Sequence, residues 1–195
     1  MRTWLNSLRQ ESQYYFSYIA GLFVPDRQPR YFDAHPNEPG DVSSWSAPDW
    51  RLLIEEGRRQ QDRQLALIEA LRTRAQFLFT TAVTVFVITG VRVGDLIDRG
   101  TLGLAAIGAL GLSLDLLSAL GAAALMFIRA DLGTIDAAKL SQQAPPIERY
   151  LAGAYSRLVR PGENTIATHN SVFRRAAFLL VLGAPVTGVL WIFVH

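Results

Sequence analysis

One carboxylate stands alone in the most apolar stretch of this chain. Asp115 lies near the middle of residues 101–128, where it is the only ionisable side chain. A carboxylate at the centre of a bilayer costs roughly 2.5–3.5 kcal/mol on insertion scales, so such groups are rare and are commonly paired or face water. If this stretch spans a membrane, Asp115 is therefore the first residue whose chemistry needs an explanation.

Small and polar residues accompany this carboxylate at helical spacing. Steps of three and four residues place Gly108, Gly111, Asp115, Ser118 and Ala122 on one face of a helix. Small residues let membrane helices approach closely, which matters because lipid provides no hydrophobic drive for their association. The pattern predicts that this face packs against another helix.

The sequence leaves two interpretations of Asp115 open. In the first, a protonated carboxyl bonds neighbouring helices, within one chain or between chains. In the second, the carboxyl and Ser118 line a water-filled path, either an oligomeric pore or a proton route. Thr84 and Thr187 lie at a similar expected depth in two other apolar stretches and are candidate partners of the carboxyl in both interpretations.

Three apolar stretches must position these side chains. A helix needs about 20 apolar residues to cross the hydrocarbon core of a bilayer, and residues 75–93, 101–128 and 176–194 are each long enough. The predicted fold is an all-α membrane protein with three transmembrane helices. Helical extensions of these spans are expected to form a membrane-proximal bundle in the cytoplasm.

Turn and capping signals set the expected boundaries. Ser46-Ala47-Pro48-Asp49 has the form of a capping box that starts a helix, and Pro145-Pro146 and Pro161-Gly162 are expected to end helices. We expect an amphipathic helix over 1–24, a proline-rich connector over 25–48, a long helix with the first span over 49–93, the second span with a polar extension over 101–142, an amphipathic helix over 147–160 and a helix with the third span over 164–195. Residues 1–24 fit a helix in the membrane interface and a helix packed on the soluble part of the protein equally well.

Basic residues predict the orientation of the spans. They are frequent before the first span and between the second and third spans, whereas the turn over 94–100 has few. The positive-inside rule then places the N-terminus and residues 129–175 in the cytoplasm, and the turn and the C-terminal His195 outside. Arginines at the expected helix ends can contact anionic lipid, or another anionic ligand such as a nucleotide: Arg72, Arg74, Arg129, Arg174 and Arg175.

Composition and motifs argue against several other functions. A net charge of +2 is too small to favour nucleic acid as a partner. The chain has no cysteine, and its histidines, His35, His169 and His195, lack metal-ligand spacing. No nucleophile elbow or phosphate-binding loop occurs. We therefore expect no enzymatic activity, no metal and no cofactor.

The layout of residues 50–140 resembles a family of bacterial membrane proteins. An amphipathic helix enters the first span through Arg72 to Leu78 (RTRAQFL), and the second span ends at Ile128 to Leu132 (IRADL). This is similar to the SLATT-type and Pycsar transmembrane effectors of nucleotide-signalled anti-phage defence. The resemblance implies a cytoplasmic helical module that oligomerises on a signal and makes the spans perturb the inner membrane. The proline-rich connector and the third span depart from that two-span layout.

Two hypotheses for function follow. The first is a non-enzymatic membrane protein that forms homo-oligomers and acts as a membrane-perturbing or channel-like effector. The second is a membrane-anchored scaffold or accessory subunit, in which the cytoplasmic helices dock a partner protein and the spans only anchor it.

Overall fold

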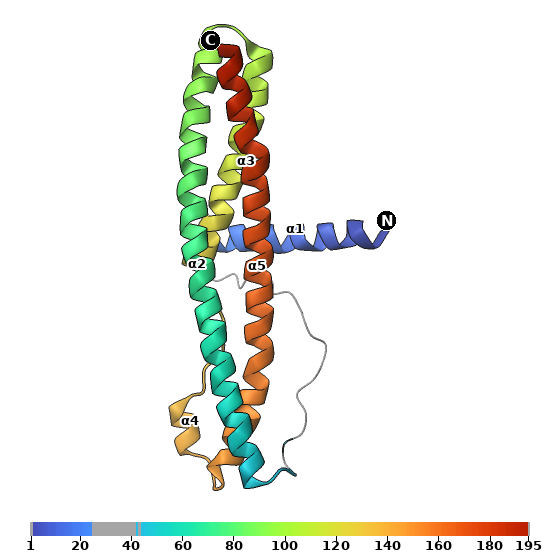
Figure 1. The fold of residues 1–195 in the computed structure, drawn as a ribbon, viewed down its shortest axis with the longest axis vertical. Helices are drawn as coiled ribbons and strands as arrows, with labels where there is room; N and C mark the ends of the chain where they lie inside the picture. Colours follow the sequence, from blue (N-terminus) through green and yellow to red (C-terminus); the bar gives the residue numbers. More distant parts are fainter. Residues whose placement is uncertain (1, 25–41, 43, 195) are drawn as a thin grey trace. The chain divides into compact units, whose positions relative to one another are not determined.

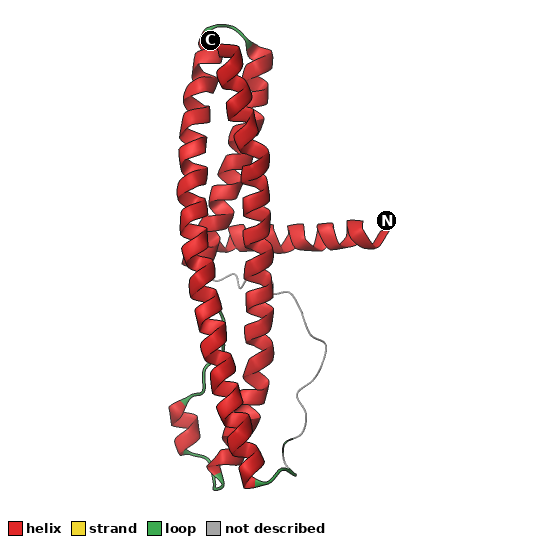
Figure 2. Cartoon of the chain, viewed as in Figure 1, coloured by secondary structure: helices red, strands yellow, loops and turns green. Residues whose placement is uncertain are grey.

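The structure is a computed structural model that describes residues 2–24, 42 and 44–194. Within these ranges it is all-helical, as predicted, and has no strand (Figure 1, Figure 2). Its helices are α1 (Arg2–Phe23), α2 (Ala47–Asp98), α3 (Leu102–Phe127), α4 (Ala137–Ser141) and α5 (Ile147–Val194). Most of the expected connector over 25–48 lies outside the described residues.

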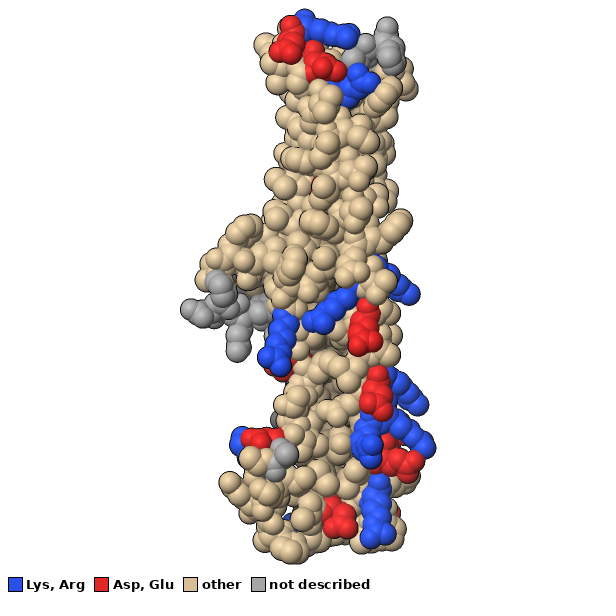
Figure 3. Space-filling model, turned by 90° about the vertical axis from the view of Figure 1, so that its left-hand side faces the viewer, with Lys and Arg blue, Asp and Glu red and all other residues tan. Residues whose placement is uncertain are grey.

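Three of these helices, α2, α3 and α5, are long and apolar enough to cross a membrane. Residues 75–91 of α2 and 176–194 of α5 contain no charged side chain, and α3 contains only Asp115. Figure 3 shows a broad surface without charged side chains. The length and composition of these helices support the prediction of a membrane protein with three spans.

The chain divides into two compact units, which we describe one at a time. The first unit consists of Met1–Arg30, Leu71–Ile128 and Asn170–His195, and the second of Tyr31–Ala70 and Arg129–His169. The first unit therefore contains the apolar parts of α2, α3 and α5. At one end of these helices, Val93, Leu96, Ala105 and Leu190 form a buried cluster that draws on all of them.

Helix α1 belongs to the first unit and lies across α3 (Figure 1). The hydroxyl of Tyr15 donates a hydrogen bond to the Leu117 carbonyl at 2.6 Å. Tyr18 and Ile19 are buried on the same side of α1. The packing partner of α1 is thus a candidate span, and not the soluble part of the protein that one of the two expectations for residues 1–24 named.

Helix α2 begins at the expected capping site. The backbone N–H of Ser46 donates to Asp49 Oδ2 at 3.1 Å, and its hydroxyl donates to the same oxygen. The hydrogen bond from the hydroxyl, and then the one from the backbone, hold the pKa of Asp49 below its usual value. Pro48 occupies the first turn, where a helix needs no donor.

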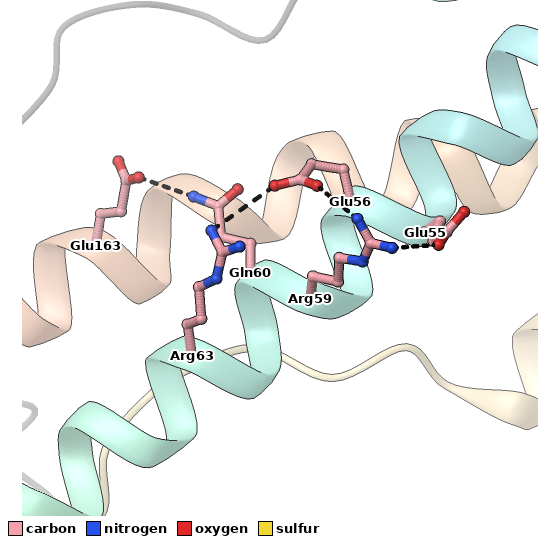
Figure 4. A network of polar contacts seen from close by, with 6 residues as sticks. All are labelled: Glu55, Glu56, Arg59, Gln60, Arg63 and Glu163. Atoms are coloured by element: carbon pink, nitrogen blue, oxygen red, sulfur yellow. Dashed lines mark hydrogen bonds and ion pairs between the residues drawn. The ribbon is translucent and has the colours of Figure 1, made fainter.

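The second unit holds the polar half of α2 and the first half of α5 side by side. Gln64 Nε2 donates to the Val159 carbonyl at 3.2 Å, and Gln60 Nε2 donates to Glu163 at 2.9 Å. Arg59 forms an ion pair with Glu55 at 2.7 Å. Figure 4 shows the surface network of this helix pair, formed by Glu55, Glu56, Arg59, Gln60, Arg63 and Glu163.

The turn between the first two spans is shorter than predicted. The sequence led us to end the first helix at residue 93, but α2 continues to Asp98. Leu96 is 2% exposed, and its burial keeps this last turn helical. The helix ends where Gly100 adopts a φ of 74° and Thr101 turns back, its N–H and hydroxyl both donating to the Leu96 carbonyl at 3.0 and 2.9 Å.

The expected helical extension of the second span is wrong. Helix α3 ends at Phe127 and Ile128 is extended, whereas the prediction continued the helix to residue 142. Gly133 has a φ of 64° and donates its N–H to Asp131 Oδ1 at 3.2 Å, which is a tight turn that no helix can pass. The short α4 then starts at its own cap, because Asp136 accepts a hydrogen bond from the Ala138 N–H at 2.9 Å.

The predicted break at Pro161-Gly162 is also wrong, because the expected helices over 147–160 and 164–195 form the single helix α5. Proline inside a helix removes one hydrogen bond and costs about 3 kcal/mol, so contacts with neighbouring segments must offset this cost. Gly162 lies directly against the Gln64 side chain, and Thr165 Oγ1 donates to the Asp131 carbonyl at 2.7 Å. α5 also passes through Pro185 without leaving the helical conformation.

The helix pair of the second unit should be sensitive to the smallest side chain added at Gly57. A Cβ there would lie 2.7 Å from Tyr155 Cβ, so one of the helices must move. We expect Gly57→Ala to lower the free energy of unfolding by about 1–3 kcal/mol. At Gly94 of the same helix, a Cβ meets nothing within 4 Å. Gly94→Ala should be neutral or stabilise by up to about 1 kcal/mol. Thermal unfolding in detergent, followed by circular dichroism, compares the two, and equal effects would contradict the packing.

Candidate functional site in the apolar helices

The face of α3 that carries Asp115 is the most distinctive site of the first unit. All the predicted packing residues of this face are buried: Gly108, Gly111, Asp115, Ser118 and Ala122. Their spacing of three and four residues places them on one side of the helix, where α2 and α5 cover them. Sequence periodicity therefore identified the buried face of α3 correctly.

The small residues of this face bring α3 close to its neighbours. Gly108 lies against Val93 of α2 and Leu190 of α5. A Cβ on Gly111 would lie 2.9 Å from Val186 Cγ1 of α5, so any larger residue would separate the helices. This face is thus used for packing within one chain.

Asp115 itself is fully buried, with 0% of its surface exposed. Its carboxylate lies against Gly183 of α5, which leaves no room there for a side chain. Neither carboxylate oxygen has a hydrogen-bond partner among the residues that the structure describes. A buried charge without a partner is strongly unfavourable, so this carboxyl is a group that gains from being neutral or from acquiring a partner.

Two threonines form the nearest polar structure. Thr89 of α2 is buried beside Asp115 and forms a hydrogen bond with Thr187 of α5. The Thr89 hydroxyl is placed to donate to the Val85 carbonyl at 2.8 Å. Either threonine hydroxyl can donate to the other, so the single Thr89 proton has three acceptors within reach: the Val85 carbonyl, Thr187 and the adjacent carboxyl of Asp115. A rotation of the Thr89 hydroxyl would be enough to redirect its proton.

Thr84, the other expected partner, lies elsewhere. Its side chain is exposed and donates to the Thr80 carbonyl of its own helix at 2.9 Å. Thr84 was expected to contact the carboxyl because of its depth along the span, but the side of the helix on which a residue lies determines what its side chain contacts. The buried positions Leu71, Ala75 and Leu78 continue in steps of three and four to Ala82, Val85 and Thr89, and this pattern would have identified Thr89.

Ser118 and Thr187 both contact a neighbouring helix. The Ser118 hydroxyl donates to the Ala176 carbonyl of α5 at 2.8 Å, in a fully buried position. Thr187 reaches α2 through Thr89. The polar groups at the centre of the first unit therefore connect its apolar helices.

The predicted boundary arginines border the apolar segments. Arg72 and Arg74 precede the uncharged part of α2, Arg174 and Arg175 precede that of α5, and Arg129 follows the end of α3. Arg74, Arg129 and Arg174 are exposed. Arg175 is half-buried and forms an ion pair with Glu11 of α1 at 3.1 Å. Arginines in these positions suit contact with headgroups, because their stems can lie along apolar surface.

Comparisons with known proteins return nothing: the chain matches no protein-family model, no curated protein and no solved structure. Among the described residues, no three side chains are grouped in a way that could hold a metal ion.

The environment of Asp115 predicts opposite responses from two neighbouring residues. Asp115→Asn keeps the size of the side chain but removes the buried charge, so we expect the free energy of unfolding to stay equal or rise. Ser118→Ala loses the hydrogen bond to Ala176 and should lower it by about 0.6–1.7 kcal/mol. Thermal unfolding of both variants in the same detergent measures this. A greater loss in Asp115→Asn than in Ser118→Ala would mean that the carboxylate has a partner.

Proposed function

We propose that this chain is a non-enzymatic integral membrane protein that acts as a scaffold or accessory subunit. Its spans anchor it, and the polar helix pair formed by residues 47–70 and 147–169 docks a partner protein. One observation carries this proposal: α2 and α5 of the same chain occupy the small and polar face of α3. A face filled in this way is not free to line a pore between copies.

The surface of the polar helix pair supports docking. Leucines that would normally face a core are exposed on α2, with exposed fractions of 69% for Leu52, 50% for Leu65 and 51% for Leu67. Exposed ion pairs lie in the same part of the helix, such as Arg59 with Glu55. Leu65 and Leu67 are two residues apart and so lie on opposite sides of the helix, and each side offers a partner an apolar anchor with charged neighbours.

A second candidate function is the homo-oligomeric, channel-like effector, which is the first of the two hypotheses from the sequence. The observation that favours it is the unpartnered carboxylate of Asp115. An assembly in which α3 moves away from Gly183 would bring this group to water or to a donor of another copy. The closed bundle would then be a resting state, and a signal acting on the polar helices would open it.

We also propose that the protein resides in a bacterial inner membrane with its polar helix pair in the cytoplasm. Arg72, Arg74, Arg174 and Arg175 lie on that side of the apolar segments, and Arg92 and Arg99 on the other. The excess of arginine at the first end supports this orientation. It places the turn at Arg99–Thr101 outside the cytoplasm.

Particle mass and ion flux distinguish the two candidate functions. Reconstituted in nanodiscs, the scaffold should be a single copy of 21.6 kDa by native mass spectrometry, and its liposomes should show no ion flux. Several copies per particle together with ion flux would contradict the scaffold and support the effector. In that case Asp115→Asn should change the flux while leaving the number of copies unaltered.

Cysteine labelling tests the orientation. The chain has no cysteine of its own, so single substitutions are unambiguous. In intact cells, a membrane-impermeant maleimide should label Asp98→Cys at the end of α2 and should fail to label Gln142→Cys beside α4. Both should react after permeabilisation, because both positions are exposed. The opposite pattern would reverse the proposed orientation.

A further inference from the structure

We infer that α1 is an in-plane membrane helix that binds the surface of the lipid bilayer through Phe16 and Phe23. This inference rests on the proposed insertion of α2, α3 and α5 in a membrane. Its partner is a phospholipid surface at the boundary between headgroups and acyl chains. The argument uses only residues of the first unit.

An ion pair fixes the level of α1 along the apolar helices. Glu11 pairs with Arg175 at 3.1 Å, and Arg175 directly precedes the uncharged segment 176–194 of α5. Glu11 is therefore held where the apolar part of α5 begins. A charged pair at this position is stable at a membrane boundary, but it would be costly within the hydrocarbon.

A buried tyrosine fixes the same level on α3. Tyr15 donates to the Leu117 carbonyl at 2.6 Å, and its ring lies so close to Gly121 that a Cβ there would be 2.7 Å from Tyr15 Cε2. Gly121 lies about 9 Å before the end of α3 at Phe127, at 1.5 Å per residue. In-plane helices bury their apolar face about 5–10 Å into the boundary region. Burial also raises the pKa of Tyr15, although Arg175 opposes this, so the hydroxyl remains a donor.

The sides of α1 have different chemistry at this level. Tyr15, Tyr18 and Ile19 are buried against the protein, whereas Phe16 and Phe23 are 56% and 69% exposed. The two phenylalanines are seven residues apart and therefore share one side of the helix. On a different side, Gln10 donates to the Tyr14 hydroxyl at 3.2 Å in an exposed position.

A lipid surface explains this arrangement better than a protein partner. Two separate aromatic rings form a small apolar area, which suits shallow insertion into a bilayer but falls short of a stable protein interface. Their position beside the first residues of a span places them where lipid must lie if the span is inserted. The Glu11–Arg175 pair and the Tyr15 hydrogen bond prevent α1 from moving away from this level.

Single nitroxide labels on the full-length protein can test the depth of α1. The test variants are Phe16→Cys and Phe23→Cys, and the matched control on the same helix is Gln10→Cys. Leu110→Cys serves as a lipid reference because Leu110 is 62% exposed on α3, and Gln142→Cys serves as a water reference. The proteins are placed in nanodiscs of phosphatidylethanolamine and phosphatidylglycerol, and circular dichroism confirms that each variant is folded.

Collisions with oxygen, which concentrates in lipid, and with a water-soluble nickel chelate report the depth of each label. We expect the ratio of oxygen to nickel accessibility to be several times higher at Phe16 and Phe23 than at Gln10, and to approach that of Leu110. Ratios at Phe16 and Phe23 equal to those at Gln10 and Gln142 would overturn the inference, as would spin–spin broadening that reveals a second copy. A water-like ratio at Leu110 as well would overturn the proposed membrane insertion, which is a distinguishable failure.

Discussion

The arrangement of the apolar helices depends on how closely α3 approaches its two neighbours. In water, apolar burial would drive such packing, but in lipid the gain must come from close contact and hydrogen bonds. Gly108 and Gly111 make this contact with Val93, Leu190 and Val186 possible. The hydrogen bonds of Ser118 and of the threonine pair then join surfaces that are already in contact.

This close packing also creates the main conflict of the structure. The approach of Gly183 leaves room for the Asp115 side chain but provides no donor for its oxygens. The two proposed functions imply different roles for this buried carboxyl. In an anchor the carboxyl is a cost that the remaining contacts offset, whereas in an effector the cost favours a second arrangement of the helices.

Periodicity in the sequence predicted the parts of the fold that depend on burial. It identified the apolar helices and the packing face of α3. The capping motif identified the start of α2 at Ser46. Each of these is a local pattern of residue types. The threonine beside the carboxyl was missed because Thr84 was chosen by its depth along the span alone, whereas Thr89 lies there because its side chain faces the interior of the first unit.

Helix boundaries were predicted least well, and for two opposite reasons. At Pro161, contacts made by distant residues such as Gln64 and Asp131 maintain a helix that local propensity would break. At Ile128, the helix ends although the next residues could continue it, because Gly133 and Asp131 form a turn. The contacts at Pro161 join residues far apart in the chain, which no local pattern records, whereas the turn of Asp131 and Gly133 is a local signal that was overlooked.

The apolar parts of the helices differ in length, and this has a consequence for the surrounding lipid. Residues 75–91 of α2 extend roughly 26 Å, while the 26 residues of α3 extend roughly 39 Å at 1.5 Å per residue. A typical hydrocarbon core is about 30 Å thick. Lipid beside α2 would therefore thin, whereas α3 has apolar length to spare and can tilt. Such hydrophobic mismatch varies around the circumference of the protein, and it would favour a thin bilayer and sort the protein away from thicker membranes.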